Sequence, residues 1–375
     1  MKSFRCVCNN RIYFENSVCC RCGRTLGFLP APALMAAVEP AGDGNWRPVG
    51  TPDDVTLYRK CANYVEHDVC NWMVPTEDAN RRCHACRLNR LIPDLDVPEN
   101  VSLWFRIETA KRRLIYTLDH LNLPVFGKAM DSERGLAFEF LRDITLGENE
   151  FSNLLGGQHH VLTGHRTGII TINIAEADPG ARERMRENMN EGYRTLLGHF
   201  RHEIAHYYWD ILVRDTKWAD RFRALFGDER TDYDAALAAY YRDGPPGDWP
   251  SRHISAYAAA HPWEDWAETW AHYLHMTDTL ETAADMSLSV RGRAIRDMAA
   301  SHDAGREAVL GDWHELTAAL NDLNRSMGLP DAYPFEISAK VAEKLGLVGE
   351  IIATASRADR PLPPNRNGAV STAPS

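Results

Sequence analysis

The chain has 375 residues, of which 44% are hydrophobic and 25% are charged, as is ordinary for a globular protein with two or three structural units. Its net charge of −10 argues against nonspecific nucleic-acid binding by the chain as a whole. The first residues lack the apolar core of a secretory signal, and no apolar run reaches the length of a membrane span. We therefore expect a cytoplasmic protein that does not contact a membrane.

The cysteines divide the first hundred residues into modules. All nine lie between Cys6 and Cys86, and an odd number at short spacings favours metal ligation over disulfides. We predict a zinc ribbon over residues 1–30, a linker rich in Pro, Gly and Ala over 31–50, and a second four-cysteine module over 51–100. Because a structural zinc takes four thiolates, each module should bind one ion. The chosen ligands are Cys6, Cys8, Cys19 and Cys22 for the first site and Cys61, Cys70, Cys83 and Cys86 for the second.

Some choices within these modules stay open. Cys20 is a fifth cysteine in the ribbon and could replace a chosen ligand, and His67 or His84 could substitute in the second site. The expected role of both sites is structural, because zinc supplies stability that a short segment cannot obtain from a core. Alternatively, the modules recognise a partner through a small basic patch at residues 81–90.

The long cysteine-free region that follows is mostly helical in pattern. β-Branched residues over 163–174 predict one strand, whose edge could pair with an extended peptide. Asp178 should cap a helix that begins at Pro179 and continues through 181–192. Apolar residues then recur at helical spacing over 193–213, which predicts a largely buried helix. These elements together indicate an α+β fold that is mostly helical and contains a small sheet.

The buried helix carries the motif HExxH at residues 202–206. Helix positions i and i+4 share a face, so the imidazoles of His202 and His206 can bind one metal ion. Glu203 lies beside the first histidine, where its carboxylate can accept a proton from a metal-bound water. The motif therefore predicts a catalytic zinc site with Glu203 as the general base.

A catalytic zinc site needs a third protein ligand and an open position. A third histidine six residues after His206 is excluded, because that position is Leu212. The remaining candidates are Glu264 and Glu268, which lie one turn apart on a predicted helix that begins at Pro262. One of them can bind zinc while the other orients a ligand histidine, and we favour Glu264 as the ligand.

Two segments carry a resemblance to a known family: YRTLLGHFRHEIAHYYWD at residues 193–210 and PWEDWAETWAHYLH at residues 262–275. They resemble a bacterial family of zinc-binding metallopeptidases whose members also have an N-terminal zinc-ribbon region. This resemblance covers nearly the whole chain and implies a zincin-like peptidase domain. The Glu-x-x-Ala-Glu pattern is also similar to that of anthrax lethal factor, a gluzincin, which implies that Glu264 is the zinc ligand. The same similarity implies that Tyr257, seven residues before Glu264, donates a hydrogen bond to the oxyanion of the reaction.

Five further residues have less specific expectations. Asp210 should either support the metal site or form a surface ion pair, and His199 should be structural or support a ligand. His165 precedes the predicted edge strand and could face the substrate. His272 and His275 are expected to be packed or to support the site rather than to bind the metal.

These observations predict a metallopeptidase domain over residues 101–357, followed by a disordered tail over 358–375. The expected activity is hydrolysis of peptide bonds in a peptide or protein substrate by zinc-activated water. About three zinc ions per chain are expected, one catalytic and two structural. The alternatives are a DNA-associated protease, in which the ribbons bind nucleic acid, and a non-catalytic zinc scaffold. Nucleic-acid binding is not favoured, and the sequence does not specify an oligomeric state.

Overall fold

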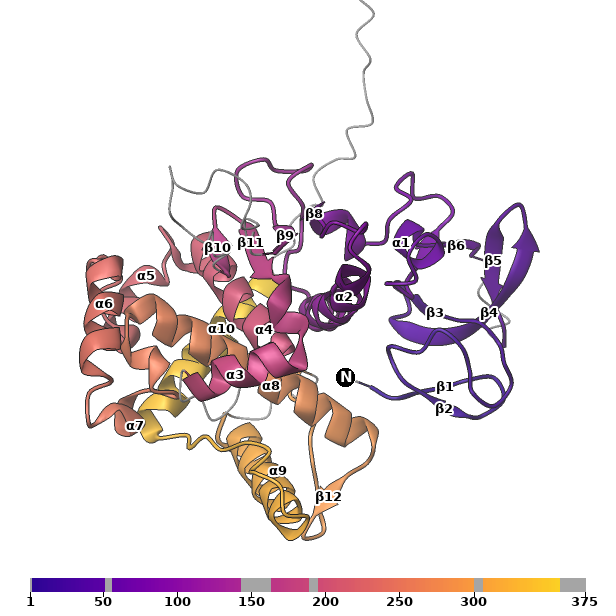
Figure 1. The fold of residues 1–375 in the computed structure, drawn as a ribbon. Coiled ribbons are helices and arrows are strands. Elements are labelled where there is room, and N and C mark those ends of the chain that lie inside the picture. The colour runs from indigo at the N-terminus through magenta and orange to yellow at the C-terminus, as the bar shows by residue number, and fades with distance from the viewer. Residues whose placement is uncertain (1, 51–55, 143–162, 189–194, 300–305, 358–375) are drawn as a thin grey trace, which may run out of the picture.

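Helices dominate the chain, and a smaller β-rich unit lies at its N-terminal end. The computed structural model describes residues 2–50, 56–142, 163–188, 195–299 and 306–357. Figure 1 shows the β-rich unit on one side of helix α2 (Pro98–His120) and the larger helical body on the other. The fold is α+β, as predicted. No described helix is both long and apolar enough to cross a membrane.

The N-terminal unit contains a short hairpin and a five-stranded antiparallel sheet with the strand order β3-β4-β5-β6-β7. The loop of the hairpin carries the first pair of predicted ribbon cysteines. A single turn of helix, α1, lies between the last two strands. The elements are β1 (Phe4–Arg5), β2 (Arg11–Ile12), β3 (Leu26–Leu29), β4 (Leu34–Gly42), β5 (Asn45–Pro48), β6 (Tyr58–Lys60), α1 (Ala62–Val65) and β7 (Met73–Pro75).

The predicted linker over residues 31–50 is wrong, because β4 and β5 occupy most of it. Ala36 and Ala37, whose residue type suggested a linker, are buried in β4 together with Met35 and Val38. The turn between the strands contains Asp43 and Gly44, which both have the positive φ that a tight hairpin requires. Since β4 pairs with β3 and β5 pairs with β6, the two predicted modules share one sheet and form one unit.

A second sheet, with the strand order β10-β11-β9-β8, lies against the helical body. The single strand predicted over 163–174 is a hairpin of β10 and β11, because Thr167 and Gly168 turn the chain with positive φ. As predicted, β10 lies at the edge of its sheet. The remaining strands are β8 (Asn89–Leu91), β9 (Ala137–Leu141), β10 (Gly164–Arg166), β11 (Ile169–Asn173), β12 (Ser289–Val290) and β13 (Arg293–Ala294).

The helix starts predicted at Pro179 and Pro262 agree with the structure, whereas the helix predicted from Tyr193 begins at Leu196. Asp178 Oδ1 accepts a hydrogen bond from Ala181 N at 2.7 Å, and Pro179 is the first residue of α3. The helix predicted over 193–213 corresponds to α4, and one π-helical turn (Trp209–Val213) continues it. Residues 189–194 and the predicted tail 358–375 lie outside the described residues. The other helices are α3 (Pro179–Asn188), α4 (Leu196–Tyr208), α5 (Ala219–Phe226), α6 (Tyr233–Asp243), α7 (Trp249–Arg252), α8 (Pro262–Asp285), α9 (Arg306–Ser326) and α10 (Ala339–Arg357), with short 3-10 turns at Cys86–Leu88, Ile174–Ala177 and Tyr257–Ala259.

One hydrophobic core runs through the β-rich unit and the helical body. Tyr116 of α2 places its ring 5.5 Å from that of Phe14 and 6.1 Å from that of Phe28, both in the β-rich unit. A second, smaller core lies beneath α9. Helix α2 therefore joins the two parts of the molecule instead of separating them.

Candidate metal centres

Helix α4 holds the HExxH motif in a buried and well-capped setting. Thr195 Oγ1 caps the helix by accepting a hydrogen bond from Gly198 N at 2.9 Å. The apolar face of α4, which includes Phe200, Ile204 and Tyr208, is fully buried. The opposite face carries the two histidines toward a cleft with a volume of about 1220 Å³.

Helix α8 supplies the glutamates from the opposite direction. Its first turn is capped by His261, whose Nδ1 accepts a hydrogen bond from Trp263 N at 3.1 Å. Trp266 Nε1 donates to the carbonyl oxygen of Ala205 at 2.9 Å and thereby fixes α8 against α4. Because the two helices run antiparallel, Glu264 faces both motif histidines, and Glu268, one turn later, faces only the first.

The side chains of His202, His206 and Glu264 converge at the floor of the cleft, where their ligand atoms all lie within 4.8 Å of one another. His202 Nε2 is 3.0 Å from Glu264 Oε2, and His206 Nε2 is 3.7 Å from Glu264 Oε1. Ligands of a tetrahedral zinc lie about 3.3 Å apart, so these spacings fit the ion. Glu264 Oε2 is buried and makes no hydrogen bond of suitable geometry, even with His202 nearby. A metal ion between these groups would satisfy that oxygen.

Glu268 contacts the same histidine from its other side. Its Oε1 lies 2.7 Å from His202 Nδ1, and its Oε2 accepts a hydrogen bond from Ser255 Oγ at 2.7 Å. Such a carboxylate fixes the ring orientation and the tautomer of a metal-ligating histidine. Glu264 thus belongs to the group that could hold a metal ion, and Glu268 lies behind His202.

Tyr233, at the first position of α6, was not identified from the sequence. Its hydroxyl donates a hydrogen bond to Glu264 Oε1 at 2.8 Å. The ring of Tyr257 lies 6.1 Å from the ring of His202. Burial and the charge of Glu264 raise the pKa values of Tyr233 and Tyr257 far above the usual range of a phenol. Both hydroxyls therefore stay protonated and can donate hydrogen bonds.

Glu203 is buried beside the first ligand histidine and contacts a second imidazole. His199 Nε2 lies 3.4 Å from Glu203 Oε1, and His199 Nδ1 contacts Glu176 Oε2. Burial alone would lower the pKa of His199, but the Glu176 and Glu203 carboxylates outweigh it and raise this pKa to about 9. No sequence pattern had pointed to Glu176.

The less specific candidates all lie along the same cleft. His165 Nε2 accepts a hydrogen bond from Gly168 N at 3.0 Å, and its ring stacks on that of His206 with centroids 6.4 Å apart. Asp210 pairs with Arg214 at 2.5 Å, which agrees with the ion-pair alternative. The cleft-lining residues that the sequence had suggested are His165, His199, His202, Glu203, His206, Asp210, Tyr257, Glu264, Glu268, His272 and His275.

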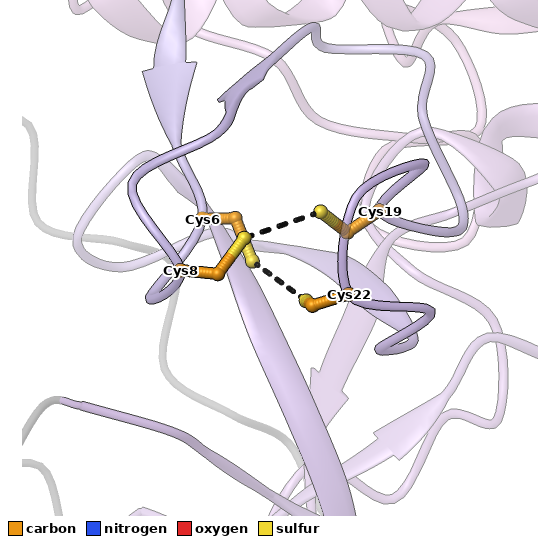
Figure 2. A group of neighbouring side chains, drawn as sticks. All are labelled: Cys6, Cys8, Cys19 and Cys22. Atoms are coloured by element: carbon orange, nitrogen blue, oxygen red, sulfur yellow. Dashed lines mark hydrogen bonds between the residues drawn. The ribbon is translucent and has the colours of Figure 1, made fainter.

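The first four-cysteine cluster lies at one end of the β-rich unit. Figure 2 shows Cys6 and Cys8 facing Cys19 and Cys22, with sulfur separations of 3.6 Å for Cys6–Cys22 and 3.7 Å for Cys8–Cys19. These separations are far longer than a disulfide bond, and they match the edge of about 3.8 Å expected around a tetrahedral zinc. Cys20 is exposed and lies outside the cluster.

The second cluster, formed by Cys61, Cys70, Cys83 and Cys86, is buried against helix α2. The sulfur atoms of Cys70 and Cys83 are 3.8 Å apart, which again fits zinc. The two candidate substitutes, His67 and His84, lie outside this cluster. Both clusters therefore have the ligand sets that the sequence predicted for zinc binding.

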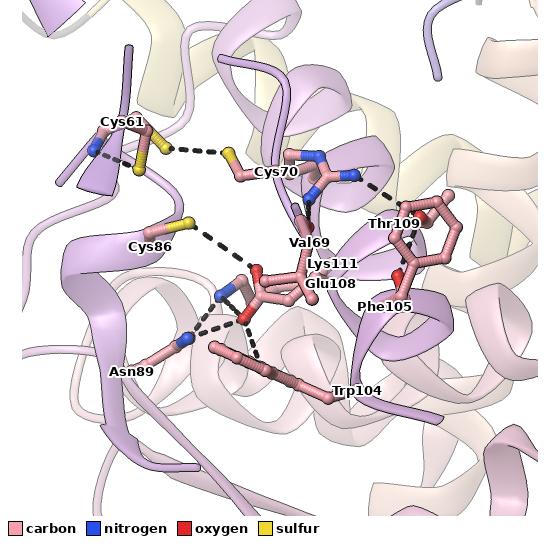
Figure 3. A network of polar contacts seen from close by, with 12 residues as sticks. Cys61, Val69, Cys70, Cys86, Asn89, Trp104, Phe105, Glu108, Thr109 and Lys111 are labelled. Atoms are coloured by element: carbon pink, nitrogen blue, oxygen red, sulfur yellow. Dashed lines mark hydrogen bonds and ion pairs between the residues drawn. The ribbon is translucent and has the colours of Figure 1, made fainter. Parts of the chain in front are cut away.

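Charged residues of α2 pack directly against the second cluster. Cys86 Sγ lies 3.7 Å from Glu108 Oε2, and Glu108 Oε1 pairs with Lys111 Nζ at 2.9 Å (Figure 3). Arg112 donates a hydrogen bond to the carbonyl oxygen of Val69 at 2.5 Å. The charges of Cys70 and other cluster thiolates raise the pKa of Arg112 against the opposing effect of burial. The buried Arg112 thus offsets negative charge of the cluster, while Lys111 offsets that of Glu108.

The sequence did not reveal the residues around the Glu264 and Glu203 carboxylates. Tyr233 precedes Glu264 by 31 residues, and Glu176 precedes His199 by 23 residues. Both contacts join elements that are separated by intervening structure, so no local spacing could indicate them. Only the contact between His199 and Glu203 has a signal in the sequence, because residues four positions apart on a helix lie one turn apart on the same face.

Comparisons with known proteins agree with this geometry. A model for a zinc-ribbon domain matches residues 3–97, and a model described as "Putative zinc-binding metallo-peptidase" matches residues 100–351. Uncharacterized proteins of Mycobacterium tuberculosis and Mycobacterium bovis are each 39% identical over 355 residues, which cover 94% of this chain and 95% of theirs. No solved structure matches the chain. The chain therefore belongs to the family of zinc-binding metallo-peptidases that this model describes.

Proposed function

We propose that this chain hydrolyses peptide bonds in a peptide or protein substrate, with a catalytic zinc held by His202, His206 and Glu264. The observation that carries the proposal is the convergence of these ligand atoms within 4.8 Å of one another at the floor of a large cleft. When bound, zinc polarises a carbonyl group and lowers the pKa of its water to about 7.

The residues around the ligands have the chemistry that the reaction needs. Glu203 accepts the proton of the attacking water and delivers it to the amine that leaves. Tyr257 donates a hydrogen bond to the carbonyl oxygen as negative charge develops there. Glu268 keeps the His202 ring oriented through its Nδ1 contact at 2.7 Å. A cytoplasmic location belongs to the same proposal, since reduced thiolate sites persist in a reducing compartment.

Replacing Glu203 by glutamine tests this proposal. The variant should keep its zinc but lose turnover of a peptide library, because the amide cannot accept the proton. Glu343→Gln, which changes an exposed glutamate on α10, is the matched control and should cleave like the wild type. A non-catalytic scaffold would show no cleavage before or after either change, and a DNA-associated protease would show cleavage that rises with added DNA and falls with salt.

A further inference from the structure

A chain of polar contacts runs from the edge of the second sheet to the proposed general base. Thr163 Oγ1 contacts Glu176 Oε1, and the other oxygen of Glu176 contacts His199 Nδ1. His199 Nε2 then lies 3.4 Å from Glu203 Oε1. One imidazole therefore bridges two carboxylates, of which one belongs to the HExxH motif.

The outer end of this chain is built into rigid backbone. Glu176 lies in the 3-10 turn between β11 and α3, and only 4% of its surface is exposed. Asn173 caps this turn by accepting a hydrogen bond from Ala175 N at 3.0 Å. Arg182 donates a further hydrogen bond to the carbonyl oxygen of Glu176 at 2.9 Å. The position of the Glu176 carboxylate is therefore set by the sheet and by α3.

The inner end of the chain constrains the proposed base. Glu203 has several rotatable bonds, and a base must lie within hydrogen-bond reach of the proton that it abstracts. A contact from His199 to Oε1 restrains the carboxylate and leaves Oε2 for the attacking water. His199 lies one helical turn before Glu203, so both side chains leave the same face of α4. A buried carboxylate such as Glu176 is costly without a partner, which ties the three groups together.

We infer that His199, anchored by Glu176, positions the Glu203 carboxylate for proton transfer. This inference rests on the proposed function, in which Glu203 is the general base. His199 acts through Glu203 and does not itself contact the substrate or the metal. Its role is therefore to raise the fraction of molecules in which the base is correctly oriented, which affects kcat and leaves zinc binding unchanged.

Two substitutions at His199 separate positioning from a general structural role. The amide of asparagine in His199→Asn lies near the former Nδ1 and can keep the Glu176 contact, but it cannot reach Glu203. The longer side chain in His199→Gln brings its amide near the former Nε2 and can donate to Glu203. We expect His199→Asn to lower kcat by about 10-fold to 100-fold, with KM and zinc content unchanged, and His199→Gln to recover much of the loss.

A matched control addresses the loss of a partly buried histidine as such. His253 lies outside the cleft lining and pairs with Asp265 at 3.2 Å, so His253→Gln should leave kcat unchanged. Equal kcat losses in both His199 variants, accompanied by lower thermal stability or lower zinc content, would overturn the inference in favour of a structural role. Wild-type kcat in His199→Asn would overturn it as well.

A structural readout separates this inference from the proposed function. In a crystal structure of zinc-loaded His199→Asn, the Glu203 carboxylate should leave its wild-type position or occupy several rotamers. An unmoved carboxylate would refute the positioning role even if the wild type cleaves peptides. Conversely, a wild type that binds zinc but cleaves no peptide would refute the proposed function, and with it any role for His199 in proton transfer.

Discussion

Replacing Glu264 and Glu268 separately by glutamine should weaken zinc binding to very different degrees. Glu264 faces both motif histidines and is the third ligand of the proposed site, so Glu264→Gln would remove the anionic member of that three-residue group. Glu268 contacts the His202 ring at 2.7 Å, and a glutamine at this position can still accept a hydrogen bond from that ring. The loss is then the difference between a charged and a neutral hydrogen bond, about 1 kcal/mol, which corresponds to roughly a fivefold loss of affinity.

The assay counts zinc per chain after dialysis against a graded series of chelator concentrations. The two thiolate clusters supply an internal reference, since neither substitution touches them and both should retain their ions. We expect Glu264→Gln to lose the catalytic ion at every chelator concentration and Glu268→Gln to lose it slightly earlier than the wild type. Retention of the ion by Glu264→Gln, combined with its loss from Glu268→Gln, would refute the ligand assignment.

Three further predictions concern the rest of the molecule. Tyr257→Phe should lower kcat by about 100-fold or more, because it removes the proposed oxyanion donor. Tyr233→Phe should mainly weaken zinc binding. If Tyr233→Phe instead lowered kcat and Tyr257→Phe weakened zinc binding, the two roles would be exchanged. Burial lowers the pKa of His272 to about 4, so the unfolded chain binds the extra proton first and stability falls as the pH drops below 6.5. Urea unfolding should therefore show a loss between pH 7 and pH 5 that is about 2 kcal/mol larger for the wild type than for His272→Gln; equal losses would contradict the neutral histidine. Cys22→Ser should remove one zinc per chain, while Cys20→Ser should leave the zinc count unchanged, and the reverse result would show that Cys20 is the ligand.

Local spacing was sufficient to predict the parts of the site that lie on one helix or on a pair of neighbouring turns. The relation of His202 to His206 follows from helical geometry, and so does that of Glu264 to Glu268. The short-range cysteine pairs were recognisable because each lies within one tight loop. In each case the chemistry depends on residues within about one helical turn or one tight loop of each other.

Composition was misleading where packing decides the structure. Residues 31–50 resemble a linker because Ala, Pro and Gly are common there, yet residues 35–38 form a strand that is buried on both faces. The Thr167–Gly168 turn was likewise hidden, since Thr167 adopts a positive φ that its residue type does not suggest. Contacts such as Tyr233 with Glu264 depend on how α6 packs against α8, which local patterns do not encode.

The placement of α2 bears on whether the ribbon unit can be separated from the peptidase domain. Lys111 and Arg112 of α2 are buried, and Arg112 is held between the second thiolate cluster and the carbonyl oxygen of Val69. From the other side of α2, Thr117 Oγ1 donates to Asp278 of α8 at 2.7 Å, and Asp278 also binds Arg201 of α4. A chain that began at residue 101 would remove the thiolate cluster and the Val69 carbonyl oxygen from Arg112, although Lys111 would keep its pairing with Glu108. It would also expose the face of α2 that packs on the β-rich unit. The helix that supports the HExxH helix therefore depends on the second zinc cluster for its own burial.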